Sequence, residues 1–172
     1  PHYVYDASKI IEQLKSLKNA FSDTDVRIKY AAKALTNISI LKLLKKHGAG
    51  VDVVSLQEAH LSLGAGFPAH EIMYTPNCVD FEEIVEGVSL GLNINLDNLS
   101  VLEKFGKKYG NTYPCCVRLN PHIMAGGNYK ISTGHSNSKF GISVYQLPQI
   151  IKPEKKHNII INGLHIHTGS EI

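Results

Sequence analysis

A short apolar strand, a polar turn and an amphipathic helix follow one another repeatedly along this chain. The first four predicted strands end about 20 to 22 residues apart, which suits βα units with short loops and a parallel sheet. Strands are predicted at residues 27–34, 51–55, 72–75, 92–97, 115–120 and 159–168. Helices are predicted at residues 7–19, 39–47, 57–64, 80–90, 99–109 and 144–152. The pattern therefore predicts the α/β fold class.

Parallel βα units close in two ways, as an open doubly wound sheet or as a TIM-type (β/α)8 barrel. No glycine-rich dinucleotide fingerprint follows the first strand. Polar or reactive side chains stand where successive strands end: Lys33, Ser55, Thr75, Asp97, Asn120 and His167. Barrel enzymes carry their chemistry at that rim, so the barrel is favoured. About six of its eight units are recognisable, and we expect residues 1–172 to form one partial barrel domain of a larger protein.

The composition is that of an ordinary globular protein, with a formal net charge of +3 on 172 residues. The lysines are scattered and form no basic stripe with aromatic residues, which argues against a nucleic-acid partner. No run of about 18 apolar residues is present, so we expect no membrane span. The three cysteines, Cys78, Cys115 and Cys116, have neither disulfide-framework nor zinc spacing, and reduced thiols point to the cytoplasm.

Lys33 closes the first apolar run and stands just before a helix. An ammonium group in such a place is poorly hydrated and close to backbone dipoles, so it loses its proton more readily. A lysine of this kind can form a Schiff base with an aldehyde cofactor. In the alternative interpretation, the lysine stem lies along apolar surface and its charged end reaches water. The segment alone favours this alternative.

The last predicted strand places His165 and His167 on one face, because side chains alternate along a strand. Three interpretations stay open for the pair. The first is two interior histidines satisfied by hydrogen bonds. The second is half of a metal site such as barrel hydrolases use, with carboxylates at other strand ends as further ligands. In the third, His167 presents its ring to an aromatic cofactor, and Gly169 and Ser170 donate hydrogen bonds to an anion such as phosphate.

Two charged residues interrupt apolar strands, Asp52 and Arg118, and each needs an opposite charge. A structural salt bridge is one way to satisfy Arg118. In the functional interpretation, one network of charges surrounds an anionic ligand and consists of Lys33, Asp52, Arg118, Lys139 and His167. The long glycine-rich segment at residues 126–141 is typical of a binding loop, although it contains no Walker motif.

Six motifs in a fixed order make the chain similar to a known enzyme family. They are Tyr30-Ala31-Ala32-Lys33-Ala34, Asp52-Val53-Val54-Ser55, Arg118-Leu119-Asn120-Pro121, Ile131-Ser132-Thr133-Gly134, Ser138-Lys139-Phe140-Gly141 and His165-Ile166-His167-Thr168-Gly169-Ser170. Together they resemble the diaminopimelate decarboxylases, fold-type III pyridoxal-phosphate enzymes that share their barrel with ornithine decarboxylase and alanine racemase. The resemblance extends from Tyr3 to Ser170. The Ile-Ser-Thr-Gly stretch favours this family over its ornithine-specific relatives.

The resemblance implies pyridoxal 5′-phosphate as the cofactor and a role for several residues. Lys33 matches the Schiff-base lysine, and His167 matches the histidine that stacks on the cofactor ring. The remaining matches are Ser170 beside the cofactor phosphate, Asp52 in the cofactor pocket, Arg118 and Lys139 in the surrounding charged network, and Glu58 close to the lysine. The chain departs from the family at Ala32 and Leu35, and the second change removes a polar group near the site.

The activity that the resemblance implies is decarboxylation of meso-2,6-diaminopimelate to L-lysine, in lysine biosynthesis, by a cytoplasmic homodimer. Decarboxylation of ornithine or carboxynorspermidine stays open, as do a metal-dependent barrel hydrolase using His165 and His167 and a non-catalytic homologue. The family's glycine-rich phosphate loop, its Glu-Pro-Gly-Arg motif and its C-terminal β-domain have no counterpart in these residues. We therefore expect residues 1–172 alone to be inactive and to associate through open strand edges.

Overall fold

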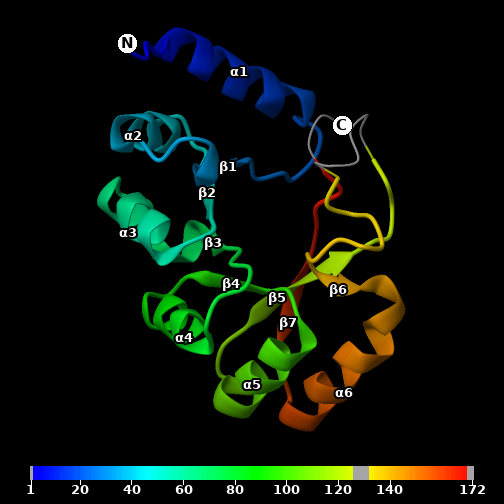
Figure 1. Ribbon diagram of the computed structural model, residues 1–172. Helices are drawn as coiled ribbons and strands as arrows, with labels where there is room; N and C mark the ends of the chain where they lie inside the picture. The colour runs from blue at the N-terminus through cyan, green and yellow to red at the C-terminus, as the bar shows by residue number, and fades with distance from the viewer. Residues whose placement is uncertain (1, 126–131, 170–172) are drawn as a thin grey trace. The chain divides into compact units, whose positions relative to one another are not determined.

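The computed structural model describes residues 2–125 and 132–169 and divides the chain into two compact units (Figure 1). Unit 1 is Pro1–Tyr74 and unit 2 is Thr75–Ile172. Within each unit the strands pair in parallel and alternate with helices, as βα units require. No helix in the described part of the chain is long and apolar enough to cross a membrane.

Unit 1 begins with a helix and continues as strand–helix units. Its elements are α1 (Ala7–Ala20), β1 (Lys29–Ala31), α2 (Ile38–Lys46), β2 (Gly50–Val53), α3 (Leu56–Gly64) and β3 (Ile72–Tyr74). β2 lies between β1 and β3 and pairs with both. Each of these elements was predicted from the sequence. β1 is shorter than predicted because the chain turns into a single 3₁₀ turn, Ala32–Ala34, directly after it.

Local capping fixes where the helices of unit 1 begin. The Asn37 side chain accepts hydrogen bonds from two backbone N–H groups in the first turn of α2, at 2.9 and 3.3 Å. At the start of α3, the Ser55 hydroxyl accepts from the N–H of Glu58 at 3.2 Å. The Glu58 carboxylate in turn accepts from the N–H of Val54 at 2.8 Å. Each helix therefore starts at a polar residue that can be recognised in the sequence.

Strand β2 separates a buried face of its sheet from a more open one. Val51 and Val53 are fully buried, whereas Asp52 between them is only partly buried and lies on the opposite face. Unit 1 also contains a small core of Leu14, Leu44 and Ala49. Ile10, Ile28, Tyr30 and Ile40 pack against it.

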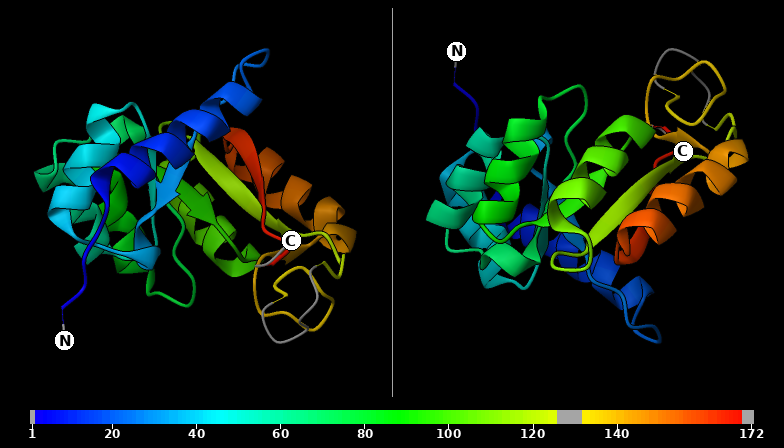
Figure 2. Two further views of the ribbon diagram at one scale, coloured as in Figure 1. Left: turned by 90° about the horizontal axis from the view of Figure 1, so that it is seen from above. Right: turned by 90° about the horizontal axis from the view of Figure 1, so that it is seen from below.

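Unit 2 is organised around strand β5. Its elements are α4 (Phe81–Ser89), β4 (Asn93–Leu96), α5 (Leu99–Tyr109), β5 (Cys115–Asn120), β6 (Ile142–Ser143), α6 (Leu147–His157) and β7 (Ile161–Ile166). β5 pairs with β4, with β7 and, at its last two residues, with β6. Figure 2 shows β5 and β7 side by side, and Figure 1 shows α5 next to α6. Leu102 and Phe105 of α5 are fully buried in the core of this unit.

The structure corrects the sequence prediction between β5 and β7. The segment predicted as a helix at 144–152 is instead a 3₁₀ turn, Val144–Gln146, followed by α6. Pro148 is acceptable in the first turn of α6, where N–H groups have no helical partner. Pro153 lies inside the helix although it removes one backbone hydrogen bond, so α6 extends beyond the predicted end. The strand β6 was not predicted, because two residues carry no readable alternation.

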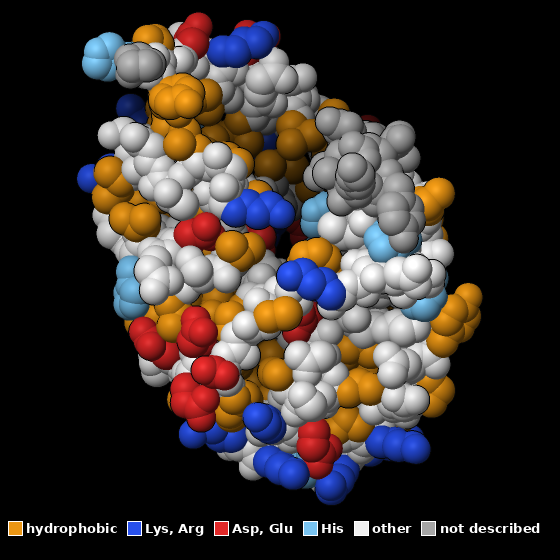
Figure 3. All heavy atoms as spheres, viewed as in Figure 1, with side chains coloured by type: hydrophobic (Ala, Val, Ile, Leu, Met, Phe, Trp, Pro, Cys, Tyr) orange, Lys and Arg blue, Asp and Glu red, His pale blue; other side chains and the backbone are white. Residues whose placement is uncertain are grey.

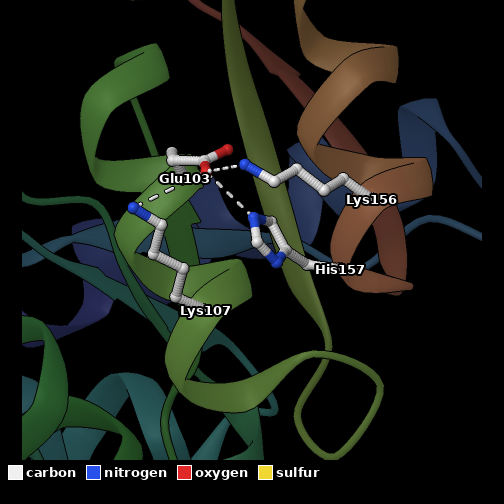
Figure 4. A network of polar contacts seen from close by, with 4 residues as sticks. All are labelled: Glu103, Lys107, Lys156 and His157. Carbon is white, nitrogen blue, oxygen red and sulfur yellow. Dashed lines mark hydrogen bonds and ion pairs between the residues drawn. The ribbon is translucent and has the colours of Figure 1, made fainter.

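Helices α5 and α6 are joined by ionic contacts around Glu103 (Figure 4). Its carboxylate accepts hydrogen bonds from Lys156 at 2.9 Å and from His157 at 3.0 Å, and Lys107 lies 3.7 Å away. The hydrogen bond from His157, followed by the one from Lys156, lowers the pKa of Glu103 to about 2. Gly106 lets the two helices approach, because a Cβ there would lie 2.9 Å from the His157 Cβ. Figure 3 shows basic side chains gathered where α5 and α6 end, as helix dipoles favour.

Strand β7 differs from the other strands in keeping apolar side chains in solvent. Leu164 and Ile166 are 66% and 53% exposed, whereas the residues that alternate with them are partly buried. Among the described strands β7 pairs with β5 alone. An exposed apolar strand face of this kind is available for packing against further protein. The association expected from open strand edges stays a prediction.

Candidate functional site

Lys33 lies in the 3₁₀ turn that follows β1 in unit 1. The Tyr30 hydroxyl donates to the carbonyl of Leu35 at 3.1 Å, and this bond joins the two ends of the turn. Burial raises the pKa of the Tyr30 hydroxyl, which keeps it a donor at neutral pH. The Lys33 side chain itself is exposed, so unit 1 does not surround it with the poorly hydrated environment that the apolar run predicted. Its place between a strand and a helix is as predicted.

The two acidic residues of the predicted site in unit 1 have different surroundings. Asp52 is in register with Ala31 of β1, so its side chain lies on the same face as the last residue of that strand. Glu58 lies in the first turn of α3, where its carboxylate accepts the N–H of Val54. The structure therefore gives Glu58 a capping role. The position of Asp52 in a cofactor pocket and that of Glu58 close to Lys33 stay predictions.

In unit 2, one aromatic ring brings Arg118 and Lys139 together. The guanidinium carbon of Arg118 lies 4.7 Å from the centroid of the Phe140 ring, and Lys139 Nζ lies 5.2 Å from it. Arg118 is 8% exposed, whereas Lys139 is exposed. A cation–π contact is stronger for the less hydrated cation, so the ring stabilises Arg118 more than Lys139. Two members of the predicted charged network thus share one ring.

His167 follows β7 and is fixed at both its ring and its backbone. The ring atom Nδ1 accepts a hydrogen bond from the N–H of Gly169 at 3.1 Å, which places the proton of the neutral ring on Nε2. The Thr133 hydroxyl donates to the carbonyl of His167 at 2.9 Å. A ring held in this way suits a residue that must present its face to a ligand, because its orientation is set before the ligand arrives.

Two motifs far apart in the sequence meet beside His167. In the Ser132-Thr133-Gly134 stretch, the backbone N–H groups of Thr133 and Gly134 both donate to the carbonyl of Thr168, at 3.0 Å. The same stretch forms an antiparallel bridge with Gly169. Gly134 has no room for a side chain, because a Cβ there would lie 2.7 Å from a backbone oxygen. The stretch and the segment after β7 therefore form one structural junction.

His165 lies on β7 directly opposite Arg118 of β5. Its Nδ1 atom is 2.6 Å from the side-chain nitrogen of Asn95 on β4. Burial first, then the charge of Arg118 and the neighbouring His167, lower the pKa of His165 to about 4. The contact agrees with the interpretation of His165 as an interior histidine satisfied by a hydrogen bond. Asn95 was not predicted as a site residue, because polar and apolar residues alternate along β4 and nothing in that pattern singles it out.

Two further expectations concern a metal and the cofactor phosphate. Among the described residues, no three His, Cys, Asp or Glu side chains are grouped closely enough to hold a metal ion. The hydrolase alternative for His165 and His167 therefore finds no ligand set in this part of the chain. Ser170 and residues 126–131 of the expected binding loop lie outside the described residues. The role of Ser170 beside a phosphate stays a prediction.

Several decarboxylases of known sequence or structure are similar to this chain. Residues 7–172 match the family described as pyridoxal-dependent decarboxylase, pyridoxal binding domain. The diaminopimelate decarboxylase of Methanothermobacter thermautotrophicus is 33% identical over 174 residues, and the match covers 100% of this chain and 41% of that protein. The chain thus spans less than half of the length of this relative.

Solved structures agree with the sequence match. Diaminopimelate decarboxylase from Helicobacter pylori, complexed with L-lysine, gives a TM-score of 0.87 at 30% identity and covers 98% of this chain and 45% of that one. Lysine/ornithine decarboxylase from Vibrio vulnificus, complexed with putrescine, gives 0.79 at 31% identity and covers 97% and 41%. These likenesses confirm the predicted fold class, an α/β chain that forms part of a (β/α)8-type barrel.

Proposed function

Because the chain belongs to the pyridoxal-dependent decarboxylase family and matches its pyridoxal binding domain, we propose that it serves the decarboxylation of meso-2,6-diaminopimelate to L-lysine. This substrate is supported by identities of 33% and 30% to two diaminopimelate decarboxylases over almost the whole chain. The observation that carries the proposal is the junction beside His167, where two motifs of the family resemblance interlock through backbone hydrogen bonds.

The described residues fit pyridoxal 5′-phosphate chemically. Lys33 offers a primary amine at the end of a strand, and the His167 ring is held by the N–H of Gly169. Arg118 offers a buried positive charge to an anionic ligand. The side-chain oxygen of Asn95 is buried and has no hydrogen-bond partner among the described residues, so an acceptor remains for a donor of the ligand or for water.

Each site residue has a proposed task in the reaction. When bound, pyridoxal phosphate would supply an electron sink for the pair left on the substrate carbon once the bond to the carboxylate breaks and carbon dioxide leaves. Lys33 Nζ attaches the cofactor and is the base or acid that moves protons beside the substrate carbon, which takes up one proton to give lysine. His167 orients the cofactor ring. The remaining groups are proposed to set the charge of the site (Asp52, Arg118 and Lys139), to hold the phosphate (Ser170) and to support the lysine segment (Glu58).

The attachment of the cofactor to Lys33 is tested by chemical trapping. Protein incubated with pyridoxal phosphate is reduced with sodium borohydride, digested and analysed by peptide mass. We expect the added mass on the peptide that contains Lys33 and its loss in Lys33→Arg. Lys42→Arg is the matched control, because Lys42 is an exposed lysine of α2, and it should leave the labelling unchanged. Labelling that persists in Lys33→Arg contradicts the proposed site.

The substrate is tested separately, by measuring carbon dioxide and the amine product with three amino acids. We expect meso-diaminopimelate to be preferred in kcat/KM by at least about tenfold over ornithine and carboxynorspermidine, because a site built to bind a second amino-acid head group leaves buried polar groups unpaired without it. A preference for ornithine would select the alternative within the family. Residues 1–172 expressed alone should release no lysine.

We further propose that the functional protein is a cytoplasmic homodimer with an amino acid as its small-molecule substrate and with no nucleic-acid or membrane partner. The support is the family resemblance, together with the exposed apolar side chains Leu164 and Ile166 on β7. Light scattering should give twice the chain mass, and a monomer at micromolar concentration would count against association.

A further inference from the structure

Three polar side chains of unit 2 gather on one face of neighbouring strands. Asn95 is on β4 and is 2% exposed, Arg118 is on β5 and is 8% exposed, and His165 on β7 is partly buried. β5 pairs with both of the other strands, and Arg118 is the register partner of His165. Burying polar groups is unfavourable unless they are paired with one another, so the contacts within this group determine whether it is stable.

The bond between Asn95 and His165 connects the two strands on either side of β5. Asn95 is in register with Cys116 of β5, and Cys116 is in register with Gly163 of β7. Gly163 has no side chain, and a Cβ there would lie 2.7 Å from the Cys116 sulfur. The β7 side chain that reaches Asn95 is therefore that of His165, two residues further along the strand, with 2.6 Å between the two nitrogens.

The bond also decides which ring nitrogen of His165 carries the proton. The side-chain NH₂ of Asn95 donates to Nδ1, so in the neutral ring Nε2 carries the hydrogen. The groups that act on the ring are Asn95 of β4, Arg118 of β5 and His167 beyond the end of β7. Burial, Arg118 and His167, in that order, lower the pKa of His165 to about 4. The ring is therefore uncharged at neutral pH.

We propose that Asn95 and His165 form a neutral positioning pair for the pyridoxal site. Asn95 fixes the orientation of the His165 ring beside Arg118. Because the ring is uncharged, Arg118 remains the positive charge of this group of three side chains. This inference rests on the proposed function for its purpose, whereas the pair itself rests on contacts within unit 2. A second cation at position 165 would lie directly opposite the Arg118 guanidinium and repel it. Arg118 then sets the charge beside the cofactor.

Nuclear magnetic resonance of histidine-labelled protein tests the pair directly. His165→Asn identifies the resonance of His165 among the nine histidines. We expect the wild-type ring to be neutral at pH 7 with its proton on Nε2. Asn95→Asp keeps the shape of the side chain but adds a carboxylate, and it should raise the His165 pKa by about 1 to 3 units. Asn162→Asp is the matched control, because Asn162 is exposed on β7, and it should change that pKa by less than half as much.

The positioning role is tested on the protein loaded with pyridoxal phosphate. The readout is the pH midpoint of the absorption change of the bound cofactor, which a merely structural role would not move. His165→Lys adds a second cation and should lower the midpoint by about one unit or more, since a nearby cation disfavours protonation. His165→Asn adds no charge and should keep the midpoint of the wild type.

Several results would contradict the proposed pair. One is a wild-type His165 that titrates at its ordinary value of 6.5. Another is an Asn95→Asp variant that moves the His165 pKa no more than Asn162→Asp does. Equal midpoints for His165→Lys and His165→Asn would refute the positioning role. If His165 is neutral but the protein binds no pyridoxal phosphate, the proposed function fails and the pair of side chains stands.

Discussion

The site residues of unit 1 and those of unit 2 are held in place by different kinds of contact. Around Lys33, the bond from Tyr30 to Leu35 spans five residues, and the Glu58 carboxylate reaches back four residues to Val54. In unit 2, the contacts of His167 and His165 span 34 and 70 residues. The first set forms with a single turn or helix, whereas the second requires an assembled sheet. The geometry of unit 2 should therefore be the more sensitive to change.

The largest expected difference between the two units is in their stability in acid, where His165 should destabilise unit 2. Its pKa in the folded protein is lowered from 6.5 to about 4, so between these values the unfolded chain binds a proton that the folded chain does not. Stability therefore falls as the pH drops from about 6.5 to 4, by about 3 kcal/mol for this group, and changes no further below that. Hydrogen exchange of peptides from each unit, corrected for intrinsic rates, measures the loss, which is expected in unit 2.

The matched comparison for the acid prediction is His165→Asn, which removes the titrating ring and keeps a polar side chain. The free energy of unfolding of the wild type should fall relative to that of the variant by the same amount over this pH range. A difference that stays constant from pH 7 to 4 would show that the ring titrates equally in the folded and unfolded chains.

A methyl group added at Gly134 should destabilise the junction beside His167. The new Cβ would lie 2.7 Å from the carbonyl oxygen of Ile123 and 3.1 Å from the Cα of Thr168, both of which are backbone atoms that cannot turn aside. We expect Gly134→Ala to lower the free energy of unfolding by about 2 kcal/mol and to weaken binding of pyridoxal phosphate. Urea unfolding and absorbance titration measure the two effects.

Unit 1 offers the matched control for this substitution. Gly64 is the last residue of α3, and a Cβ there meets nothing within 4 Å. Gly64→Ala should therefore be neutral or stabilise the protein by up to about 1 kcal/mol, since alanine is the better helix former. Equal losses for both alanine variants would mean that close backbone contact does not distinguish the two units.

The same contrast explains what the sequence could and could not predict. The helices that follow Asn37 and Ser55 were predicted, and the contacts that cap them depend on neighbours within one turn. The bonds of Thr133 to His167 and of Asn95 to His165 depend on strand pairing and leave no local pattern. For that reason the motifs containing Thr133 and His167 could be recognised while their contact could not.

The burial of a residue was harder to predict than its place among the helices and strands. Lys33 lies where the apolar run ends, as expected, yet its side chain is exposed in unit 1 because it leaves the sheet on a 3₁₀ turn. The segment around Pro153 was predicted to end a helix, whereas α6 continues through it because Pro153 and Ile150 are buried in the unit 2 core. Burial depends on tertiary packing, and a sequence pattern reports it only indirectly.

Loss of single hydroxyl groups should produce smaller and comparable effects in the two units. Thr133→Ala removes the bond to the His167 carbonyl, and Ser55→Ala removes the cap of α3; each should cost about 1 kcal/mol. Only Thr133→Ala should also weaken binding of pyridoxal phosphate, because it alone loosens His167. Thr133→Ser keeps the hydroxyl and should restore binding. Failure of the serine variant to do so would assign the effect to the lost methyl group.

The smallest expected effect concerns the ion pairs of Glu103, whose side chain is 30% exposed. Contacts with His157 and Lys156 lower its pKa from 4.5 to about 2, so their contribution to stability is complete above pH 4.5 and is lost as the pH falls toward 2. Glu103→Gln should lower the melting temperature slightly at pH 6 and not at pH 2.

The control is Glu12→Gln in unit 1, where the side chains of Glu12 and its partner Lys9 are 65% and 59% exposed. Because solvent screens that exposed pair, its loss should change the melting temperature less. A larger change at Glu12 than at Glu103 would reverse the expected order of the two units.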